Sequence, residues 1–231
     1  MELDKIYCTD CLKAMREIPS GSVQLVVADP PYELKQHGES KGSAFGRKGR
    51  EYHSTIEPMQ TGVSFAVLEE MVRVCEKPNI YLFCSKDQLY KILPWAVSHN
   101  LKYDILTWHK TNPVPTCNNK YLSDTEYIVF MRNGADLYGS YDTKHKYFLT
   151  PTNTKDKKMY GHPTPKPVNI LQTLIENSTR EGAVVLDPYM GCGSTAIACL
   201  RSGRHFIGFD IDENYCKMAE QRIQNFRDSE W

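Results

Sequence analysis

Short apolar runs rich in β-formers alternate along the chain with segments of helical periodicity, and this alternation constrains the fold most. The expected strands are Lys5–Cys8, Val23–Ala28, Ile80–Cys84, Tyr103–Trp108, Glu126–Met131, Ala183–Leu186 and His205–Phe209. The expected helices are Leu12–Glu17, Val63–Cys75, Asp87–Ser98, Val168–Asn177, Ser194–Ser202 and Glu213–Phe226. Strands that alternate with helices predict an α/β fold, in which a mostly parallel sheet carries helices on both faces.

Two irregular stretches, residues 33–62 and residues 133–167, interrupt the alternation, and each follows an expected strand. Long irregular connections are typical of functional loops, and open α/β sheets place their binding loops at the carboxyl ends of strands. Both stretches contain clusters of basic residues, namely Lys35, Lys41, Arg47, Lys48 and Arg50 in the first and Lys144, Lys146, Lys155, Lys157 and Lys158 in the second. The segments Lys35–Arg50 and Lys144–Lys158 are either solvated loops or contacts for nucleic-acid phosphates.

The length and composition limit the class of protein. A chain of 231 residues fits one domain, 1–231, in which the two irregular stretches are a loop and a small insertion. No apolar run could span a bilayer and the N-terminus lacks the layout of a secretion signal, so we expect a soluble, cytoplasmic protein. The 28 acidic and 28 basic residues balance, which gives no global signal for nucleic acid. Cys8 and Cys11 form one CxxC pair without a second at zinc-finger spacing, so we predict no metal site.

The segment Asp29-Pro30-Pro31-Tyr32 follows the apolar run that ends at Ala28. The two prolines fix two successive φ angles and remove two backbone donors. This rigid exit holds the Asp29 carboxylate and directs the Pro30 carbonyl outward, while Tyr32 offers an aromatic face. Two fixed acceptors beside an aromatic ring suit a planar group that bears NH2. The alternative is a turn that happens to contain these residue types.

A second segment runs from the strand ending at Leu186 through Asp187, Pro188, Tyr189 and the Gly191-Cys192-Gly193 turn into a helix. Glycines at such a turn let backbone N–H groups approach a ligand at the helix N-terminus. The Gly-Lys-Ser/Thr ending of a phosphate loop is absent. A further strand follows and ends at Asp210, whose carboxylate is placed to bind ribose hydroxyls. The pattern predicts an adenosine compound without a required pyrophosphate.

These segments together resemble the amino-methylating DNA methyltransferases of the permuted, beta arrangement. That family opens on Gly-Asp-Cys-Leu, here Thr9-Asp10-Cys11-Leu12, and continues with the catalytic tetrapeptide that Asp29–Tyr32 matches. His162-Pro163-Thr164-Pro165-Lys166-Pro167 matches the family's His-Pro-x-x-Lys-Pro, and Asp187–Thr195 matches its cofactor loop, with Tyr189 in place of Phe and Ser194 in place of Thr. Weaker similarities are Trp108–Pro113 and Thr125–Phe130. The resemblance covers nearly the whole chain.

The resemblance implies a circularly permuted, Rossmann-like methyltransferase fold with a seven-stranded sheet, and S-adenosylmethionine as the cofactor. The strand before Asp187 would lie centrally, between the strands that end near Asp210 and Asp29, with the strand near Asp10 beyond the former. The implied roles are ribose binding by Asp210, adenine binding by Asp10 and contact with the methionine amino group by Asp187. Gly191, Gly193 and Lys166 would approach the rest of the methionine portion, alongside Pro188 and Tyr189. Alternatively, Asp187 caps the turn and Lys166 is an ordinary lysine before a helix.

The function implied is methyl transfer to the exocyclic amino group of a flipped base in duplex DNA, catalysed by Asp29, Pro30, Pro31 and Tyr32. Adenine N6 is preferred because the cytosine enzymes more often begin the tetrapeptide with Ser. Cytosine N4, RNA adenine and an inactive nucleic-acid-binding module of the same fold are the alternatives. The related protein-glutamine enzymes begin the tetrapeptide with Asn, which counts against them. A homodimer is expected because relatives are often dimeric. A restriction–modification context is expected, with a regulatory role and phage defence as the alternatives.

Overall fold

A computed structural model describes residues 1–32, 62–115, 119–160 and 164–229. The strands are β1 (Lys5–Cys8), β2 (Leu25–Ala28), β3 (Asn79–Cys84), β4 (Lys102–Lys110), β5 (Thr125–Arg132), β6 (Tyr147–Thr150), β7 (Val184–Asp187) and β8 (His205–Asp210). The helices are α1 (Cys11–Met15), α3 (Phe65–Val74), α4 (Leu89–Ser98), α5 (Thr154–Tyr160), α6 (Val168–Ser178), α7 (Ser194–Arg201) and α8 (Glu213–Ser229). Strands and helices alternate along most of the chain, as the sequence predicts.

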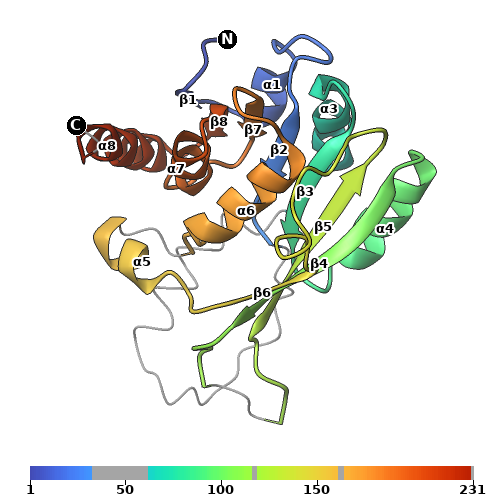
Figure 1. Cartoon of the computed structure of the whole chain (residues 1–231), viewed down its shortest axis with the longest axis vertical. Helices are drawn as coiled ribbons and strands as arrows, with labels where there is room; N and C mark the ends of the chain where they lie inside the picture. Colours follow the sequence, from blue (N-terminus) through green and yellow to red (C-terminus); the bar gives the residue numbers. More distant parts are fainter. Residues whose placement is uncertain (33–61, 116–118, 161–163, 230–231) are drawn as a thin grey trace.

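All the described strands join one sheet in the order β1-β8-β7-β2-β3-β5-β4-β6 (Figure 1). Neighbours from β1 to β3 pair in parallel, and among the described strands only β5 runs in the opposite direction. The four strands that carry the predicted site, β1, β8, β7 and β2, lie side by side in the expected order. Their carboxyl ends therefore meet at one edge of the sheet.

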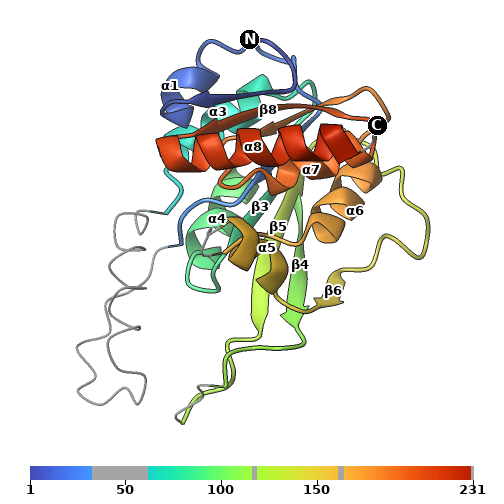
Figure 2. The same ribbon diagram turned by 90° about the vertical axis from the view of Figure 1, so that its left-hand side faces the viewer.

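Helices cover both faces of the sheet, with α6, α7 and α8 on one side and α1, α3 and α4 on the other (Figures 1 and 2). Two buried clusters correspond to these two layers. Alternate residues of a strand point to opposite faces, so Leu25 and Val27 of β2 enter the first cluster and Val26 and Ala28 enter the second. Because β2 is buried on both faces, its position in the sheet, and that of Asp29 directly after it, is fixed from both sides.

The structure departs from the sequence-based expectation in the region 133–167. The sheet has eight described strands rather than seven, because Tyr147–Thr150 forms β6 and pairs in parallel with β4. Helix α5 also lies within this stretch, which the sequence predicted to be irregular throughout. β6 is a four-residue edge strand whose residues are alternately exposed and half-buried, and its short apolar run lies within a stretch that is otherwise polar and irregular.

Residues 33–61 of the first irregular stretch, including the basic cluster Lys35–Arg50, lie outside the described residues. Within the described part of the chain, no helix combines the length and the apolar character needed to cross a bilayer.

Candidate active site

Four aspartates lie at the carboxyl edge of adjacent strands. Asp187 and Asp210 are the last residues of β7 and β8, Asp29 follows β2 directly, and Asp10 comes two residues after β1. The register aligns these ends, because Cys8 pairs with Asp210, and Asp187 pairs with Gly208. Residues that are far apart in the sequence are thus brought to one edge by the strand order.

The Asp29 carboxylate forms an ion pair with Lys166, whose Nζ lies 2.5 Å from Asp29 Oδ2. Lys166 precedes α6 by two residues and its side chain is only 7% exposed, so it is not an ordinary surface lysine. The Lys166 ammonium also lies 3.4 Å from Glu126 Oε2. Glu126 forms a second ion pair with Lys110, whose Nζ lies 2.7 Å from Glu126 Oε1. The four side chains Lys110, Glu126, Lys166 and Asp29 form a chain of alternating charges, called below the charge chain.

Tyr32 joins the charge chain through its hydroxyl group. Its O–H donates to Glu126 Oε2 at 3.0 Å, and the Lys166 ammonium lies 5.3 Å from the centre of its ring. The two ends of the tetrapeptide are therefore tied to the same pair of side chains, Asp29 through Lys166 and Tyr32 through Glu126.

Burial and charge act in opposite directions on these groups. Burial raises the pKa of Asp29, Lys166 lowers it and Glu126 raises it again, with a net upward shift. Burial alone would raise the pKa of Glu126, but Lys166 and Lys110 lower it to about 2. Burial opposes the charge on Lys166, yet Asp29 and Glu126 raise the pKa of this lysine. Glu126 and Lys166 are therefore held in their charged forms.

The turn after β7 is held by its own carboxylates. Asp187 Oδ1 accepts a hydrogen bond from the Tyr189 N–H at 2.9 Å, and Asp210 Oδ2 accepts one from the Gly191 N–H at 2.8 Å. Gly193 has φ of 79°, in the left-handed region that favours glycine, and α7 begins at the next residue. The resulting loop, residues 187–194, is called below the glycine loop.

Asp187 lies at the base of the glycine loop and is almost fully buried. Burial raises its pKa to about 7, although hydrogen bonds from Thr195 and the Tyr189 N–H lower it. Burial likewise raises the pKa of Asp210, against hydrogen bonds from the Asp212 and Gly191 N–H groups. A buried carboxyl group of raised pKa is stabilised in its charged form by a cationic or hydrogen-bond-donating ligand. This edge of the sheet is therefore suited to a ligand that carries ammonium and hydroxyl groups.

Asp10 lies at the same edge but is exposed. Its Oδ1 accepts a hydrogen bond from the Lys13 N–H at 2.9 Å, which makes it the N-cap of α1. Capping accounts for one oxygen atom of the carboxylate and leaves further acceptor capacity for a ligand.

The sequence alone predicts no role for Glu126 or Lys110, although both lie in segments that resemble the family. The signal for Glu126 was a single carboxylate at the start of an otherwise apolar strand, where a charged side chain requires a partner. His162 and Pro163, which complete the motif around Lys166, lie outside the described residues.

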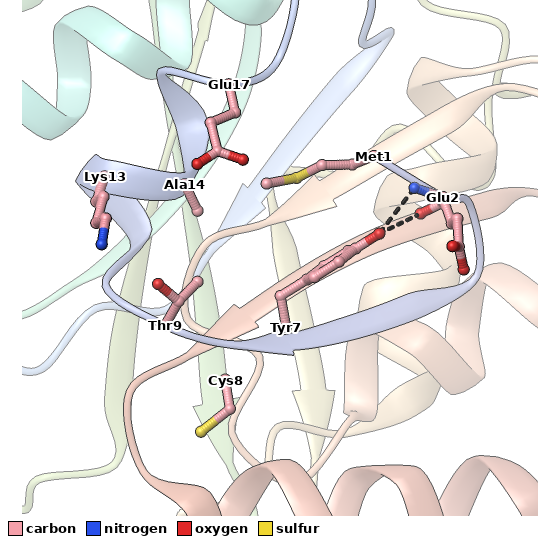
Figure 3. A pocket seen from close by; sticks show the side chains of 8 residues that line it. All are labelled: Met1, Glu2, Tyr7, Cys8, Thr9, Lys13, Ala14 and Glu17. Atoms are coloured by element: carbon pink, nitrogen blue, oxygen red, sulfur yellow. Dashed lines mark hydrogen bonds between the residues drawn. The ribbon is translucent and has the colours of Figure 1, made fainter.

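A surface hollow of ≈ 550 Å³ lies along β1 and α1 (Figure 3). It is lined by Met1, Glu2, Tyr7, Cys8, Thr9, Lys13, Ala14 and Glu17. The lining contains neither the Asp29 tetrapeptide nor the glycine loop, so this hollow is not where the predicted chemistry would take place.

Comparison with known proteins identifies a family and several relatives. The family model N6_N4_Mtase, described as DNA methylase, matches residues 23–221, a span that includes both Asp29 and Asp210. The chain is 29% identical to the type II methyltransferase M2.DpnII of Streptococcus pneumoniae, over 94% of this chain and 88% of that protein.

Solved structures share the fold. The structure of the M1.HpyAVI–SAM complex has a TM-score of 0.70 at 20% identity and covers 94% of this chain and 98% of its own. PvuII DNA methyltransferase, described as cytosine-N4-specific, has a TM-score of 0.69 at 15% identity, covering 96% of this chain and 90% of its own. The Rossmann-like fold expected from the sequence is therefore confirmed.

Proposed function

This chain belongs to the N6_N4_Mtase family of DNA methylases, and on that premise we propose that it methylates the N6 amino group of adenine in DNA, with S-adenosylmethionine as the methyl donor. The observation that carries the proposal is the common location of Asp29 and the glycine loop. They follow β2 and β7, which are neighbouring parallel strands, so a base held at Asp29 and a cofactor held at the loop would be adjacent.

The residues at the sheet edge fit the proposed cofactor. S-adenosylmethionine has an amino group and two ribose hydroxyls, all hydrogen-bond donors, and the edge offers the carboxylates of Asp187, Asp210 and Asp10. The raised pKa of the buried Asp187, about 7, is the property expected of a carboxyl group that lacks its cationic partner. Asp187 would bind the amino group and Asp210 the ribose, and the glycine loop, with Pro188 and Tyr189, would lie against the methionine portion.

When bound, the cofactor supplies a methyl group that is already activated on a sulfonium centre, so the protein contributes position and electrostatics. The exocyclic nitrogen of a base is a poor nucleophile because its lone pair is delocalised into the ring. Hydrogen bonds from the amino group to the Asp29 carboxylate and the Pro30 carbonyl would favour a pyramidal nitrogen with a directed lone pair. Lys166 contacts Asp29 Oδ2, and a carboxylate accepts up to about four hydrogen bonds, so acceptor capacity remains.

The target base must leave the duplex to reach Asp29, because an exocyclic amino group inside the stack is not accessible to this edge. The Tyr32 ring would stack on the flipped base, with Pro31 and Pro30 holding the backbone between it and Asp29. Stacking of a base on an aromatic side chain contributes about 1–3 kcal/mol, which offsets part of the cost of flipping.

Contacts with the DNA backbone are proposed for the basic segments. Lys144, Lys146, Lys157 and Lys158 are exposed, and Lys146 forms an ion pair with Asp104. Phosphate contacts of this kind position a protein on DNA without reading its sequence. The segment Lys35–Arg50 would act in the same way, and a homodimer would present two such surfaces.

Adenine rather than cytosine is proposed because the tetrapeptide begins with Asp29. The cytosine-methylating enzymes of the family that this chain resembles more often have Ser at that position. The protein can be assayed for transfer of labelled methyl groups to duplex DNA, single-stranded DNA, RNA and protein. We expect transfer to duplex DNA, with N6-methyladenine as the product. Labelling of RNA alone, or of cytosine alone, would contradict the proposal.

A further inference from the structure

Glu126 is a partly buried carboxylate with three partners at the candidate active site. Its side chain is 15% exposed, Lys110 contacts one oxygen, and Lys166 and the Tyr32 hydroxyl contact the other. We propose that Glu126 is a positioning residue for methyl transfer, which fixes the side chains of Asp29 and Tyr32 through contacts with Lys166 and the Tyr32 hydroxyl. This inference rests on the proposed function and assigns a role to a residue outside the catalytic tetrapeptide.

The topology of the sheet places Glu126 at this edge. β5 runs opposite to β3, so β5 begins where β3 ends, and Tyr127 pairs with Cys84, the last residue of β3. Glu126, one residue before Tyr127, is therefore brought to the carboxyl edge of the parallel strands. The one described antiparallel strand supplies a carboxylate there from its beginning rather than its end.

The tetrapeptide needs such a residue because prolines fix the backbone but not the side chains. Pro30 and Pro31 restrict φ, whereas the χ angles of Asp29 and Tyr32 at either end remain free to rotate. The Lys166 ammonium holds the Asp29 carboxylate, and Glu126 holds both Lys166 and the Tyr32 hydroxyl. Reacting groups must lie within a few tenths of an ångström of the productive geometry, so loss of this restraint slows transfer.

The balance of charge at the site is a second reason to expect slower methyl transfer without Glu126. The charge chain contains two acids and two bases in alternation, so each internal member has two opposite charges beside it. Without Glu126, the charge on Lys166 would be neutralised by Asp29 alone and Lys110 would be left without its acid. A buried charge that loses its partner rearranges or draws in water. Asp29 would then be bound more closely to Lys166 and be a weaker acceptor for the amino group of the base.

The test substitutes Glu126→Gln, which keeps the size of the side chain and removes the charge. Single-turnover methyl transfer to duplex DNA is expected to slow by about 10- to 100-fold. The dissociation constant of the cofactor and the KM for DNA are expected to stay close to wild type, because Glu126 lies outside the contacts proposed for either ligand. The melting temperature is expected to fall, because Lys110 loses its acid. Glu126→Asp, which restores the charge, is expected to recover part of the rate.

Two further variants keep the test decisive. Glu70→Gln is a matched control, because Glu70 is 18% exposed and paired with Arg73 at 2.7 Å. It lies on α3, on the other face of the sheet from α6, and the transfer rate of this variant is expected to be unchanged. Lys110→Met, made alone and combined with Glu126→Gln, is the second. The double variant removes the whole Lys110–Glu126 ion pair and leaves Lys166 paired with Asp29, so it is expected to fold even if Glu126→Gln alone does not. The double variant should be slowed by less than the product of the two single effects, because the residues act through one contact.

A transfer rate within about twofold of wild type for both Glu126→Gln and the double variant, with duplex DNA methylated normally, would overturn this inference and leave the proposed function intact. A slowing that is matched by a loss of melting temperature and is not relieved by Glu126→Asp would also overturn it. If the wild-type protein transfers no methyl group to DNA, the proposed function fails and this inference fails with it.

Discussion

The Lys166 ammonium lies 2.5 Å from the Asp29 carboxylate, and the two residues come from opposite thirds of the chain. This ion pair connects the proposed catalytic tetrapeptide to the segment before α6, for which the sequence predicts contact with the cofactor. Contact of Lys166 with a bound cofactor remains a prediction. Its contact with Asp29 gives the lysine a role in setting the charge and direction of the proposed hydrogen-bond acceptor.

Replacement of Asp29 should separate transfer from cofactor binding. Asp29→Ala removes the proposed acceptor of the amino hydrogens, so we expect transfer to fall by at least about 100-fold. Cofactor affinity should persist, because the proposed cofactor contacts come from the glycine loop and Asp210. Single-turnover assays and calorimetry measure the two quantities. Normal turnover in Asp29→Ala would refute the catalytic assignment.

Replacement of Asp210, unlike that of Asp29, should weaken cofactor binding. Its Oδ2 accepts a hydrogen bond from the Gly191 N–H at 2.8 Å, and its Oδ1 accepts one from the Asp212 N–H at 2.9 Å. Asp210 therefore anchors the glycine loop in addition to making the proposed contact with the ribose. For Asp210→Ala we expect the dissociation constant of S-adenosylmethionine to rise by about 10- to 100-fold, the loss of one or two charged hydrogen bonds. Glu213→Gln, an exposed carboxylate nearby on α8, is the control. An unchanged dissociation constant would count against the role of Asp210.

The buried Asp187 should make cofactor binding depend on pH. Its pKa in the free protein is about 7, against 3.8 for an ordinary aspartate, so the folded protein retains a proton that the unfolded chain loses. The carboxyl group therefore stabilises the fold fully below about pH 4, and this contribution is lost as the pH rises to about 7. A cationic amino group binds the carboxylate form, so affinity should fall on acidification.

Calorimetry between about pH 5 and pH 8 should show affinity falling by up to about tenfold per pH unit below pH 7, with proton release on binding. Asp187→Asn should bind more weakly and lose most of this dependence. The same pH dependence in Asp187→Asn as in the wild type would assign it to other groups.

A pair of glycine substitutions should isolate the packing of the glycine loop. Gly193 and Gly182 have nearly the same left-handed φ, 79° and 77°, so alanine at either position costs about 1–2 kcal/mol. A Cβ on Gly193 would also lie 3.1 Å from Ala219 Cβ on α8, whereas a Cβ on Gly182 would meet nothing within 4 Å. Gly193→Ala should therefore lower the melting temperature more and also weaken cofactor binding. Equal effects of the two substitutions would show that the approach to α8 is unimportant.

Sequence patterns were sufficient for the parts of this fold that follow strong local rules. The strands that meet at the carboxyl edge are mostly apolar runs. The motifs at their ends predict that Asp29, Asp187 and Asp210 lie together at this edge, which is where the structure has them. By contrast, β6 is short and half-exposed, and α5 has the sequence TKDKKMY, without an apolar stripe. Both elements depend on neighbouring structure rather than on local periodicity, so neither was predicted.

The contacts within the charge chain could not be predicted from the sequence. Which lysine pairs with Glu126 depends on the antiparallel direction of β5 and on where the chain enters α6. A carboxylate in an apolar strand signals that a partner exists but does not identify it. The sequence therefore located the tetrapeptide and the glycine loop, while the side chains that orient Asp29 and Tyr32 emerged only from the three-dimensional arrangement.

The most direct measurement is a nucleoside analysis of DNA from a host that lacks its own DNA methylation and expresses this chain. Enzymatic digestion followed by mass spectrometry separates N6-methyladenine, N4-methylcytosine and 5-methylcytosine. We predict N6-methyladenine in DNA from cells with the wild-type protein and none in DNA from cells with Asp29→Ala. DNA without any methylated base, or with N6-methyladenine at wild-type levels in the Asp29→Ala strain, would contradict the account.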